Sequence, residues 1–421
     1  MAKKLIPPKN SSSPTRVIEK LLKEKLIGQE RAIREIIRGL ERAYSGLKNP
    51  DHPVAVLAFF GPTGTGKTFA AEALANCFPR HKVWRCPRHY ECGYVITEEE
   101  RQAGIQVAEY CPTHNGKLRI EKIVSNTIWT IDCGGVSGAL DHAITTLMGS
   151  PPSYVGQEIT PIFTGGKAPH VVLFDEAEKA LLTKNWSGGS SFANVLLKIL
   201  EKGRIRNNLN EEIDFTQSII ILTGNLGAAE ILKEFEGVLG FHVSSKDRHR
   251  DIAQMTDQEV GDLNKRIYSV VKKKAERDLA PEFLNRLDRL VVFHFLTRSG
   301  YERILQNEIA KLQSQIARAI KRKKVPAFVL TFTPAALDYL LREAMADRRF
   351  GARPLVRVLE KRVVTPLAEL INNRVIRAGD HLQARVEKAA DGDEELEETI
   401  VFFLTSSSKE RPLKSHKSGN A

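Results

Sequence analysis

Short runs of consecutive apolar residues recur along the amino-terminal part of the chain, spanning 54–60, 127–131, 170–174, 218–222 and 289–293. Runs of this length without polar alternation are typical of strands that are buried on both faces of a parallel sheet. Helical or polar segments separate the runs, and before the first run two segments with helical apolar spacing meet at Gly28. The pattern predicts a doubly wound α/β domain with a five-stranded parallel sheet.

The pattern changes from Thr297 onward to long amphipathic segments at 301–324, 333–345 and 353–373, followed by strand-like segments at 381–387 and 399–404. This order predicts a second, smaller, mainly helical domain with a short sheet. The ends of the chain are rich in Pro, Ser and Lys, which is typical of disorder. We therefore expect disordered ends around two domains, with boundaries at 1–15, 16–296, 297–404 and 405–421.

The chain has 421 residues, of which 42% are hydrophobic, so it can bury more than one core. No apolar run approaches the roughly 20 residues that a membrane helix needs. The start MAKKLIPPKN lacks the apolar segment of a secretory signal, and five thinly spread cysteines fit a reducing compartment. We expect a cytoplasmic protein.

A formal net charge of +12 gathers partly at the two ends, in MAKK and KERPLKSHK. Basic segments of this kind are either solvated tails or a surface for nucleic acid, and the charge alone leaves both interpretations open.

The segment GPTGTGKT directly follows the first apolar run and precedes a helical segment, which is the context of a phosphate-binding P-loop. Glycines let backbone amides curl around phosphates, the lysine reaches the terminal phosphates, and the last hydroxyl takes a position on Mg²⁺. The segment predicts a site for ATP and Mg²⁺ made of Gly61, Pro62, Thr63, Gly64, Thr65, Gly66, Lys67 and Thr68.

Two later runs end in polar residues suited to phosphate chemistry. The third run ends in Asp175 and Glu176, where the aspartate can hold Mg²⁺ and the glutamate can activate the attacking water. Asn225 follows the fourth run in Thr223-Gly224-Asn225, where its amide can position that water or contact the γ-phosphate. An ordinary turn containing asparagine is the alternative for this last residue.

The succession of the P-loop, FDEAEK, TGNLG, PEFLNRLD and FGARPL, together with LIGQERAI near the start, resembles AAA+ ATPases of the Clp type, most closely the second ATPase module of ClpB and ClpC. The resemblance implies a large P-loop domain followed by a smaller lid domain. It also implies a hexameric ring.

The resemblance implies roles for three further residues. Arg286 in PEFLNRLD matches the arginine finger that completes a neighbouring subunit's site, and Arg353 in FGARPL matches the second sensor. A guanidinium suits both roles because it is planar and always charged. Ile27 in LIGQ matches the segment that packs on the adenine base. Without the resemblance, each arginine would be interpreted as a surface ion-pair partner.

The loop GSPPSYVGQ matches the central-pore loop of the family, in which Tyr154 would grip a polypeptide and Val155 would accompany it. An aromatic ring suits this task because it offers a large contact area at low rotamer entropy. Local packing of Tyr154 is the alternative.

A tripeptide in GVLGFHV resembles the motif by which related unfoldases dock on a protease ring: Leu239, Gly240 and Phe241. The alternative is an isolated flexible hydrophobic loop, because three residues match easily by chance.

A segment of nearly fifty residues, 80–126, interrupts the large domain and is far longer than a usual connection of roughly 2 to 6 residues. It holds two Cys-Pro-x-His sequences, which resemble the knuckles of a zinc ribbon and supply four candidate ligands for a structural Zn²⁺: Cys86, His89, Cys111 and His114. Cys92 is a substitute ligand. Reduced cysteines and surface histidines in a loop are the alternative. The Clp modules lack this insertion, so the resemblance implies nothing about its role.

These features together predict an ATP-dependent protein unfoldase or remodelling chaperone that threads a polypeptide through a hexameric ring. Two alternatives are a nucleic-acid remodelling ATPase, which the charge and the insertion favour, and an unfoldase subunit docked on a partner protease. A nucleotide-switched scaffold is disfavoured because Glu176 and Arg286 are both present.

Overall fold

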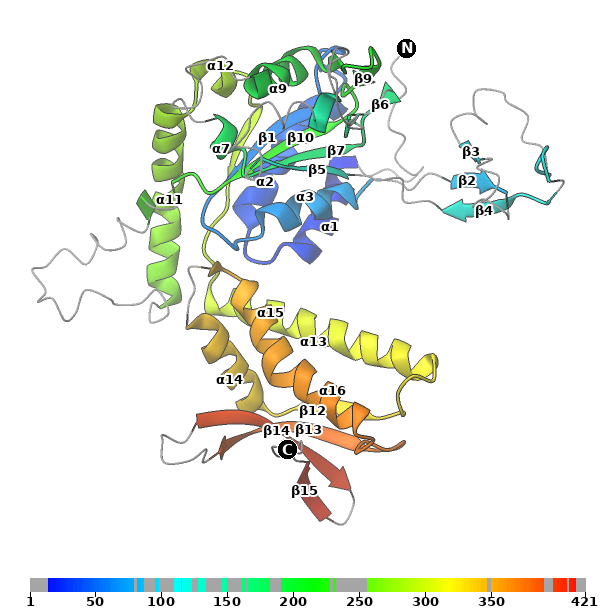
Figure 1. Cartoon of the computed structure of the whole chain (residues 1–421). Coiled ribbons are helices and arrows are strands. Elements are labelled where there is room, and N and C mark those ends of the chain that lie inside the picture. The colour runs from blue at the N-terminus through cyan, green and yellow to red at the C-terminus, as the bar shows by residue number, and fades with distance from the viewer. Residues whose placement is uncertain are drawn as a thin grey trace, which may run out of the picture.

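The computed structural model describes residues 14–78, 82–86, 95–97, 110–114, 116–122, 128–133, 146–149, 161–163, 166–181, 191–227, 230–231, 256–346, 350–389, 397–406 and 409–413. In Figure 1 they form a layered α/β part with a small separate sheet beside it, and a helical part with its own sheet below.

The α/β part is built on five parallel strands, whose order across the sheet is β11-β1-β10-β7-β5. Their bounds are β1 (Ala55–Phe60), β5 (Ile128–Asp132), β7 (Val171–Asp175), β10 (Ile219–Gly224) and β11 (Arg289–Val292). All six residues of β1 and of β10 are buried, because helices cover both faces of the sheet. The predicted five-stranded parallel sheet is confirmed.

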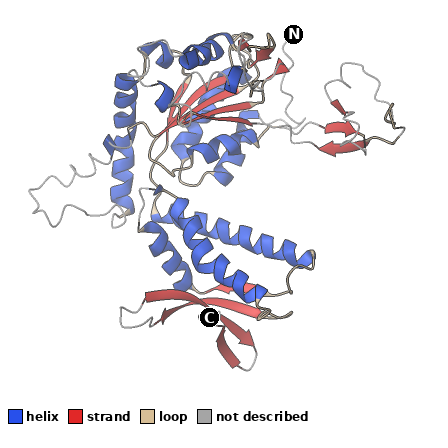
Figure 2. Cartoon of the chain, viewed as in Figure 1, coloured by secondary structure: helices blue, strands red, loops and turns tan. Residues whose placement is uncertain are grey.

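Alternate residues of each strand enter two separate cores, since successive strand side chains point to opposite faces. In β1, Leu57 and Phe59 pack against the first three helices, α1 (Pro14–Lys25), α2 (Glu30–Tyr44) and α3 (Lys67–Ala75). On the other face, Ala58 and Phe60 belong to the core that contains α9 (Ser191–Lys202), α11 (Asp257–Asp278) and α12 (Pro281–Leu284). Figure 2 shows these helices on both sides of the strands.

Two small sheets accompany the central one. Next to it lie β6 (Gly166–Lys167), β8 (Arg204–Arg206) and β9 (Glu212–Asp214) in the order β6-β9-β8. The predicted insertion contains an antiparallel sheet in the order β3-β2-β4, made of β2 (Lys82–Arg85), β3 (Val95–Thr97) and β4 (Arg119–Lys122). This second sheet lies away from the central sheet in Figure 1.

The carboxy-terminal part consists of helices packed on one four-stranded sheet in the order β12-β13-β14-β15. Its helices are α13 (Arg298–Lys321), α14 (Pro334–Met345), α15 (Arg353–Leu359) and α16 (Thr365–Asn372), and its strands are β12 (Val329–Phe332), β13 (His381–Ala389), β14 (Glu397–Ser406) and β15 (Lys409–Leu413). Threonine hydroxyls cap two of the helices, Thr297 on α13 and Thr333 on α14. The predicted helical domain with a short sheet is confirmed.

Two details differ from the sequence-based expectation. The segment 353–373 is interrupted by a π-helical turn, η3 (Glu360–Val364), in which the Thr365 amide bonds to the Glu360 carbonyl. Pro366 follows and cannot donate an amide to the α-helical ladder, which is a common cause of such irregularity.

The other difference concerns the expected disordered end from 405, since β14 continues to Ser406 and β15 pairs with it in antiparallel register. Pro412 lies opposite Phe403, and an edge strand tolerates a proline at such a position.

None of the helices in the described part of the chain is both long and apolar enough to cross a membrane.

Candidate functional site

The loop between β1 and α3 turns through three glycines with positive φ: Gly61 (141°), Gly64 (73°) and Gly66 (96°). A side chain at Gly61 would place its Cβ 2.5 Å from the Phe293 carbonyl oxygen, so only glycine fits there. Gly66 precedes the first residue of α3, and the free amides of a helix start favour phosphate. The loop therefore has the backbone of an anion-binding site.

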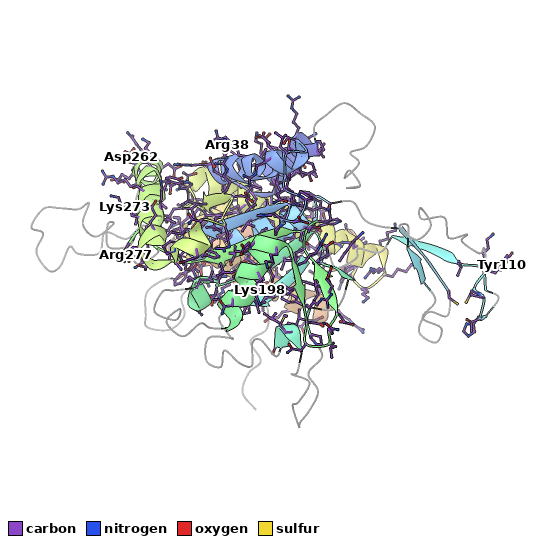
Figure 3. All side chains as sticks on the ribbon, turned by 90° about the horizontal axis from the view of Figure 1, so that it is seen from above. Arg38, Tyr110, Lys198, Asp262, Lys273 and Arg277 are labelled. Carbon is purple, nitrogen blue, oxygen red and sulfur yellow. The ribbon has the colours of Figure 1, made fainter. Side chains whose placement is uncertain are left out.

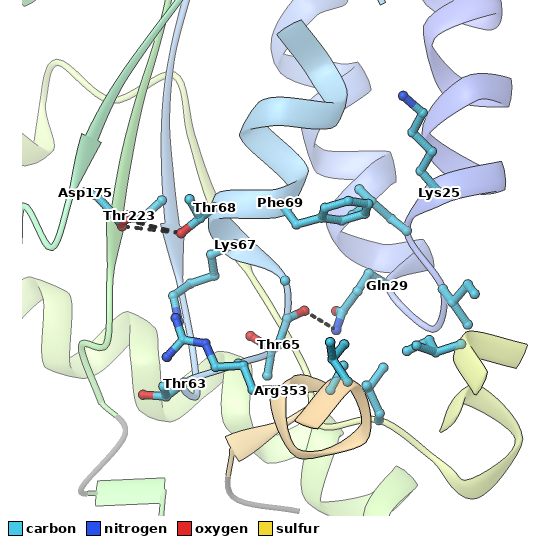
Figure 4. Close-up of a pocket in the computed structure, with 18 of the residues that line it drawn as sticks. Lys25, Gln29, Thr63, Thr65, Lys67, Thr68, Phe69, Asp175, Thr223 and Arg353 are labelled. Carbon is cyan, nitrogen blue, oxygen red and sulfur yellow. Dashed lines mark hydrogen bonds between the residues drawn. The ribbon is translucent and has the colours of Figure 1, made fainter. Parts of the chain in front are cut away.

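A pocket of about 390 Å³ opens beside this loop (Figure 4). Its lining combines the α1–α2 connection, the P-loop, the ends of β7 and β10, and helices of the carboxy-terminal part. The predicted site residues among its lining are Ile27, Thr63, Gly64, Thr65, Gly66, Lys67, Thr68, Asp175, Glu176, Asn225 and Arg353. Gly61 and Pro62 contribute through their carbonyl groups, which accept hydrogen bonds from Lys67.

Lys67 is buried at the centre of the pocket and donates three hydrogen bonds, to the carbonyls of Gly61 (3.0 Å) and Pro62 (2.8 Å) and to Asn225 Oδ1 (3.0 Å). Burial lowers the pKa of the Lys67 ammonium to about 8, against the opposing influence of the nearby Glu178 and Asp175 carboxylates. A γ-phosphate would offer this ammonium a better counter-charge than the carbonyls do.

The end of β7 places Asp175 beside the start of α3. Thr68 Oγ1 lies 3.4 Å and 3.5 Å from the two Asp175 carboxylate oxygens, and the Thr223 hydroxyl donates to the same carboxylate. A hydroxyl and a carboxylate are hard oxygen ligands of the kind that Mg²⁺ prefers next to phosphates. The residues therefore fit a nucleotide-bound Mg²⁺.

Glu176 adopts a left-handed backbone conformation with φ of 54°, which is uncommon for a residue other than glycine. Its amide donates to Thr223 Oγ1 (3.3 Å), and its carboxylate forms an ion pair with Lys179. Glu176 is among the residues that line the pocket.

Glu178 is a site residue that the sequence reasoning missed. Its Oε1 accepts the Asn225 amide (2.9 Å), whereas its Oε2 is buried without a hydrogen-bond partner in the described part of the chain. Burial raises the pKa of this carboxyl. A Cβ at Gly224 would come within 2.5 Å of Oε2, which explains the glycine before Asn225. The only sequence signal was a third acid in FDEAEK.

Gln29 is the second residue that the sequence reasoning left without a role. Its buried amide donates to the carbonyls of Thr65 (3.2 Å) and His294 (2.9 Å), and its Oε1 accepts the His294 amide (3.0 Å). Gln29 therefore ties the P-loop to the chain just beyond β11. Burial lowers the pKa of the His294 imidazole to about 4.

The carboxy-terminal part closes the pocket through the start of α15. The Ala352 amide donates to the Gly64 carbonyl (3.1 Å), and the buried Tyr301 hydroxyl donates to the Gly351 carbonyl (3.0 Å). This contact brings Arg353 to the pocket, where Figure 4 shows its side chain reaching toward Lys67. The helix begins at Arg353 itself, with Pro354 in its first turn.

Arg286 lies apart from this pocket. It follows α12, donates to Glu201 Oε2 (3.0 Å) and to the Glu282 carbonyl, and is absent from the described residues that line the pocket. Several predicted residues lie outside the described part of the chain: His89, Cys92, Tyr154, Val155, Leu239, Gly240 and Phe241.

The P-loop follows β1 of a parallel sheet, and the Thr68 hydroxyl at the start of α3 faces the Asp175 carboxylate at the end of β7. This arrangement defines a nucleotide-binding protein of the P-loop class. Comparison with protein families identifies residues 52–290 as an AAA domain (Cdc48 subfamily) and residues 296–384 as the C-terminal, D2-small domain, of ClpB protein.

The sequence is also similar to curated bacterial proteins. It is 28% identical over 373 residues to the chaperone protein ClpB of Rhodopseudomonas palustris, covering 88% of this chain and 33% of that protein. It is 30% identical over 373 residues to the chaperone protein ClpB 1 of Synechocystis, covering 87% and 32%. It is 31% identical over 374 residues to the negative regulator of genetic competence ClpC/MecB of Bacillus subtilis, covering 88% and 36%.

The chain therefore belongs to the AAA family, with a carboxy-terminal domain of the Clp type, and it is an ATPase of that family. The predicted family and enzyme class are confirmed. The chain spans about a third of the length of the curated relatives it matches.

Proposed function

We propose that this chain is an ATP-dependent protein-remodelling ATPase in which nucleotide binding is coupled to the position of the carboxy-terminal domain. The observation that carries the proposal is the contact of Ala352 with Gly64, by which the segment before α15 packs on the P-loop and brings Arg353 into the pocket. In the proposed organisation, residues 16–296 form the large domain and 297–404 form the lid. The names of the similar chaperones support this direction.

In the proposed site, the P-loop amides and Lys67 bind the phosphates, and Ile27 packs on the base. Thr68 and Asp175 hold Mg²⁺, which when bound neutralises phosphate charge. Glu176 orients the attacking water and accepts its proton, a role that its place in the pocket lining next to Asp175 supports.

Asn225 would contact the γ-phosphate from the position where its amide group now accepts from Lys67 and Thr63. Arg353 would sense the same phosphate from the lid. Release of the carbonyls of Gly61 and Pro62 would free the Lys67 ammonium for the nucleotide.

The proposal extends to a homo-hexameric ring in which Arg286 completes the site of a neighbouring subunit. Support comes from its position, because Arg286 does not line the described pocket of its own chain and keeps a surface ion pair with Glu201. A finger that acts between subunits requires a closed head-to-tail assembly. Tyr154 and Val155 would then face the channel and grip a polypeptide.

The test is the rate of ATP hydrolysis with no polymer, with an unfolded protein and with DNA or RNA. We expect stimulation by the unfolded protein. Stimulation by nucleic acid alone would overturn the proposal in favour of the nucleic-acid remodelling ATPase, toward which the net charge of +12 points.

Two variants separate ATP binding and hydrolysis from the unfolding of a protein substrate. Glu176→Gln should bind ATP and retain it, because the proton acceptor is removed while the phosphate site stays. Tyr154→Ala should hydrolyse ATP normally yet fail to unfold a reporter protein. Retained unfolding by Tyr154→Ala would refute the pore role.

A separate assay adds a partner protease and measures degradation of the reporter protein. Degradation that depends on Leu239 and Phe241 would identify an unfoldase that docks on the protease.

A further inference from the structure

Two turns of the insertion that lie far apart in the sequence meet at one point. Cys86 directly follows β2, and Cys111 begins a turn closed by the Tyr110–Lys117 bridge and by a hydrogen bond from the Cys111 amide to the Gly116 carbonyl (2.8 Å). Tyr110, labelled in Figure 3, shows how far this turn lies from the central sheet. The ligand atoms of Cys86, Cys111 and His114 all lie within 4.8 Å of one another.

The surroundings of these atoms are those of a metal site. Cys86 and Cys111 are each 1% exposed, although the sheet beside which they lie is small and stands away from the central sheet. His114 Nδ1 is buried and has no hydrogen-bond partner in the described part of the chain. A buried polar nitrogen without a partner destabilises the folded state, and a bound ion would remove this cost.

The separations also suit a tetrahedral ion. Zinc–sulfur bonds of about 2.3 Å and zinc–nitrogen bonds of about 2.0 Å place neighbouring ligand atoms roughly 3.5 to 3.8 Å apart. The three atoms need to approach by only about 1 Å to reach this geometry. Two thiolates and an imidazole are soft to borderline ligands, which select zinc over magnesium or calcium.

We propose that Cys86, Cys111 and His114 bind one structural Zn²⁺ that holds β2 to the turn after Tyr110. His89, from the sequence pattern, remains the predicted fourth ligand. A three-stranded antiparallel sheet of this size gains little stability from its own core, so an ion that links its turns would supply much of the folding free energy. The site is separate from the nucleotide pocket and does not depend on the proposed function.

Metal analysis of the purified full chain tests the proposal. We expect about one zinc per chain in the wild type. Cys86→Ser and Cys111→Ser should lose most of it, and His114→Ala should lower it. Cys77→Ser is the matched control, because Cys77 is a half-buried cysteine outside the insertion whose thiol donates to the Ala73 carbonyl, as a serine hydroxyl can. All four variants should retain basal ATP hydrolysis. Wild type without zinc after growth in zinc-supplemented medium, or Cys86→Ser with as much zinc as Cys77→Ser, would overturn the proposal.

A measurement on the wild type alone covers the case in which a variant fails to fold. Replacement of the metal by Co²⁺ should produce a sulfur-to-cobalt charge-transfer absorption, because thiolates are ligands. Mass spectrometry without reductant should find both cysteines reduced. A disulfide between Cys86 and Cys111, or cobalt binding without thiolate absorption, would refute zinc ligation.

Discussion

Glu178 joins the ends of two neighbouring strands at the nucleotide pocket. Glu178 lies just after β7, and its carboxylate accepts a hydrogen bond from the backbone amide of Asn225, which follows β10. Glu178→Ala would leave this amide without its acceptor and would shift the Asn225 side chain that now contacts Lys67. Because a displacement of about 1 Å in a catalytic group costs up to about a hundredfold, we expect ATP hydrolysis to fall about ten- to a hundredfold.

Glu178→Gln separates the acceptor from the charge. Its amide oxygen can still accept from Asn225, so hydrolysis should stay within a few-fold of the wild type if positioning is the role of Glu178. Steady-state kinetics of both variants check this, with nucleotide affinity measured in parallel. Equal losses in the two variants would mean that the negative charge, rather than the hydrogen bond, is what the site needs.

Lys67 should make nucleotide binding depend on pH. Burial lowers its pKa to about 8 in the protein without nucleotide, and phosphate would raise that pKa because it favours the ammonium. Binding therefore takes up no proton below about pH 8, where Lys67 is already charged. Above that value affinity should fall, by up to about tenfold per pH unit, until the higher pKa of the bound state is passed.

Calorimetric titrations in buffers with different ionisation enthalpies would measure this proton uptake. Lys67→Arg is the matched control, because arginine stays charged throughout the range and should remove the uptake even if it binds more weakly. An affinity that is constant from pH 7 to 9.5 in the wild type would contradict the prediction.

Among individual residues, the sequence predicted those site residues whose role depends on neighbours along the chain. Lys67 and Thr68 lie within one short motif, and Asp175 ends a recognisable apolar run, so local sequence was sufficient. Gln29 and Glu178 act through contacts with segments that are distant in sequence, Thr65 and His294 for one and Asn225 for the other. Only the packing of the strands creates these contacts, and no local sequence pattern predicts them.

The connection before α15 meets the P-loop through two glycine backbones. Gly351 has φ of 57°, and a Cβ there would overlap the Gly64 carbonyl. Gly351→Ala should therefore push the start of α15 off the P-loop and withdraw Arg353 from the pocket. We expect ATP affinity to fall by at least about tenfold, which corresponds to about 1.4 kcal/mol.

Gly379→Ala is the matched control, because Gly379 also has positive φ in the same domain and a Cβ there would meet nothing within 4 Å. Both variants carry the backbone strain, of about 1 kcal/mol, but only one carries the steric clash. Titration with a fluorescent ATP analogue, after thermal unfolding confirms similar stability, compares them. Equal affinities would mean that the contact does not support binding.

Among the elements, long periodic segments were predictable and short or interrupted ones were not. The apolar runs predicted the five central strands, most clearly β1 and β10, whose residues are all buried. The turn η3 arises from Pro366 within an otherwise helical pattern, and β15 contains Pro412 among charged residues, which by composition resembles a tail. β15 forms because it pairs with β14, and the composition of the segment alone does not reveal this partner.

For the whole molecule, the proposed ring makes each nucleotide site depend on two subunits. Arg286→Ala should bind ATP but hydrolyse it poorly, because its own pocket is intact and only the neighbour's finger is missing. Glu176→Gln should be inactive for the opposite reason, since it keeps the finger and loses the proton acceptor. Each variant alone should therefore show little hydrolysis.

Co-expression of the two variants tests whether the arginine acts between subunits. A site is restored wherever an Arg286→Ala subunit with its intact Glu176 receives the arginine of a Glu176→Gln neighbour. Random assembly creates this pairing at about a quarter of the head-to-tail interfaces, so we expect hydrolysis near a quarter of the wild-type rate. Mixed preparations that stay as inactive as the single variants, while gel filtration shows both in one assembly, would place Arg286 outside catalysis between subunits. Recovery would require a site shared between neighbouring subunits, because no single chain in the mixture carries both groups.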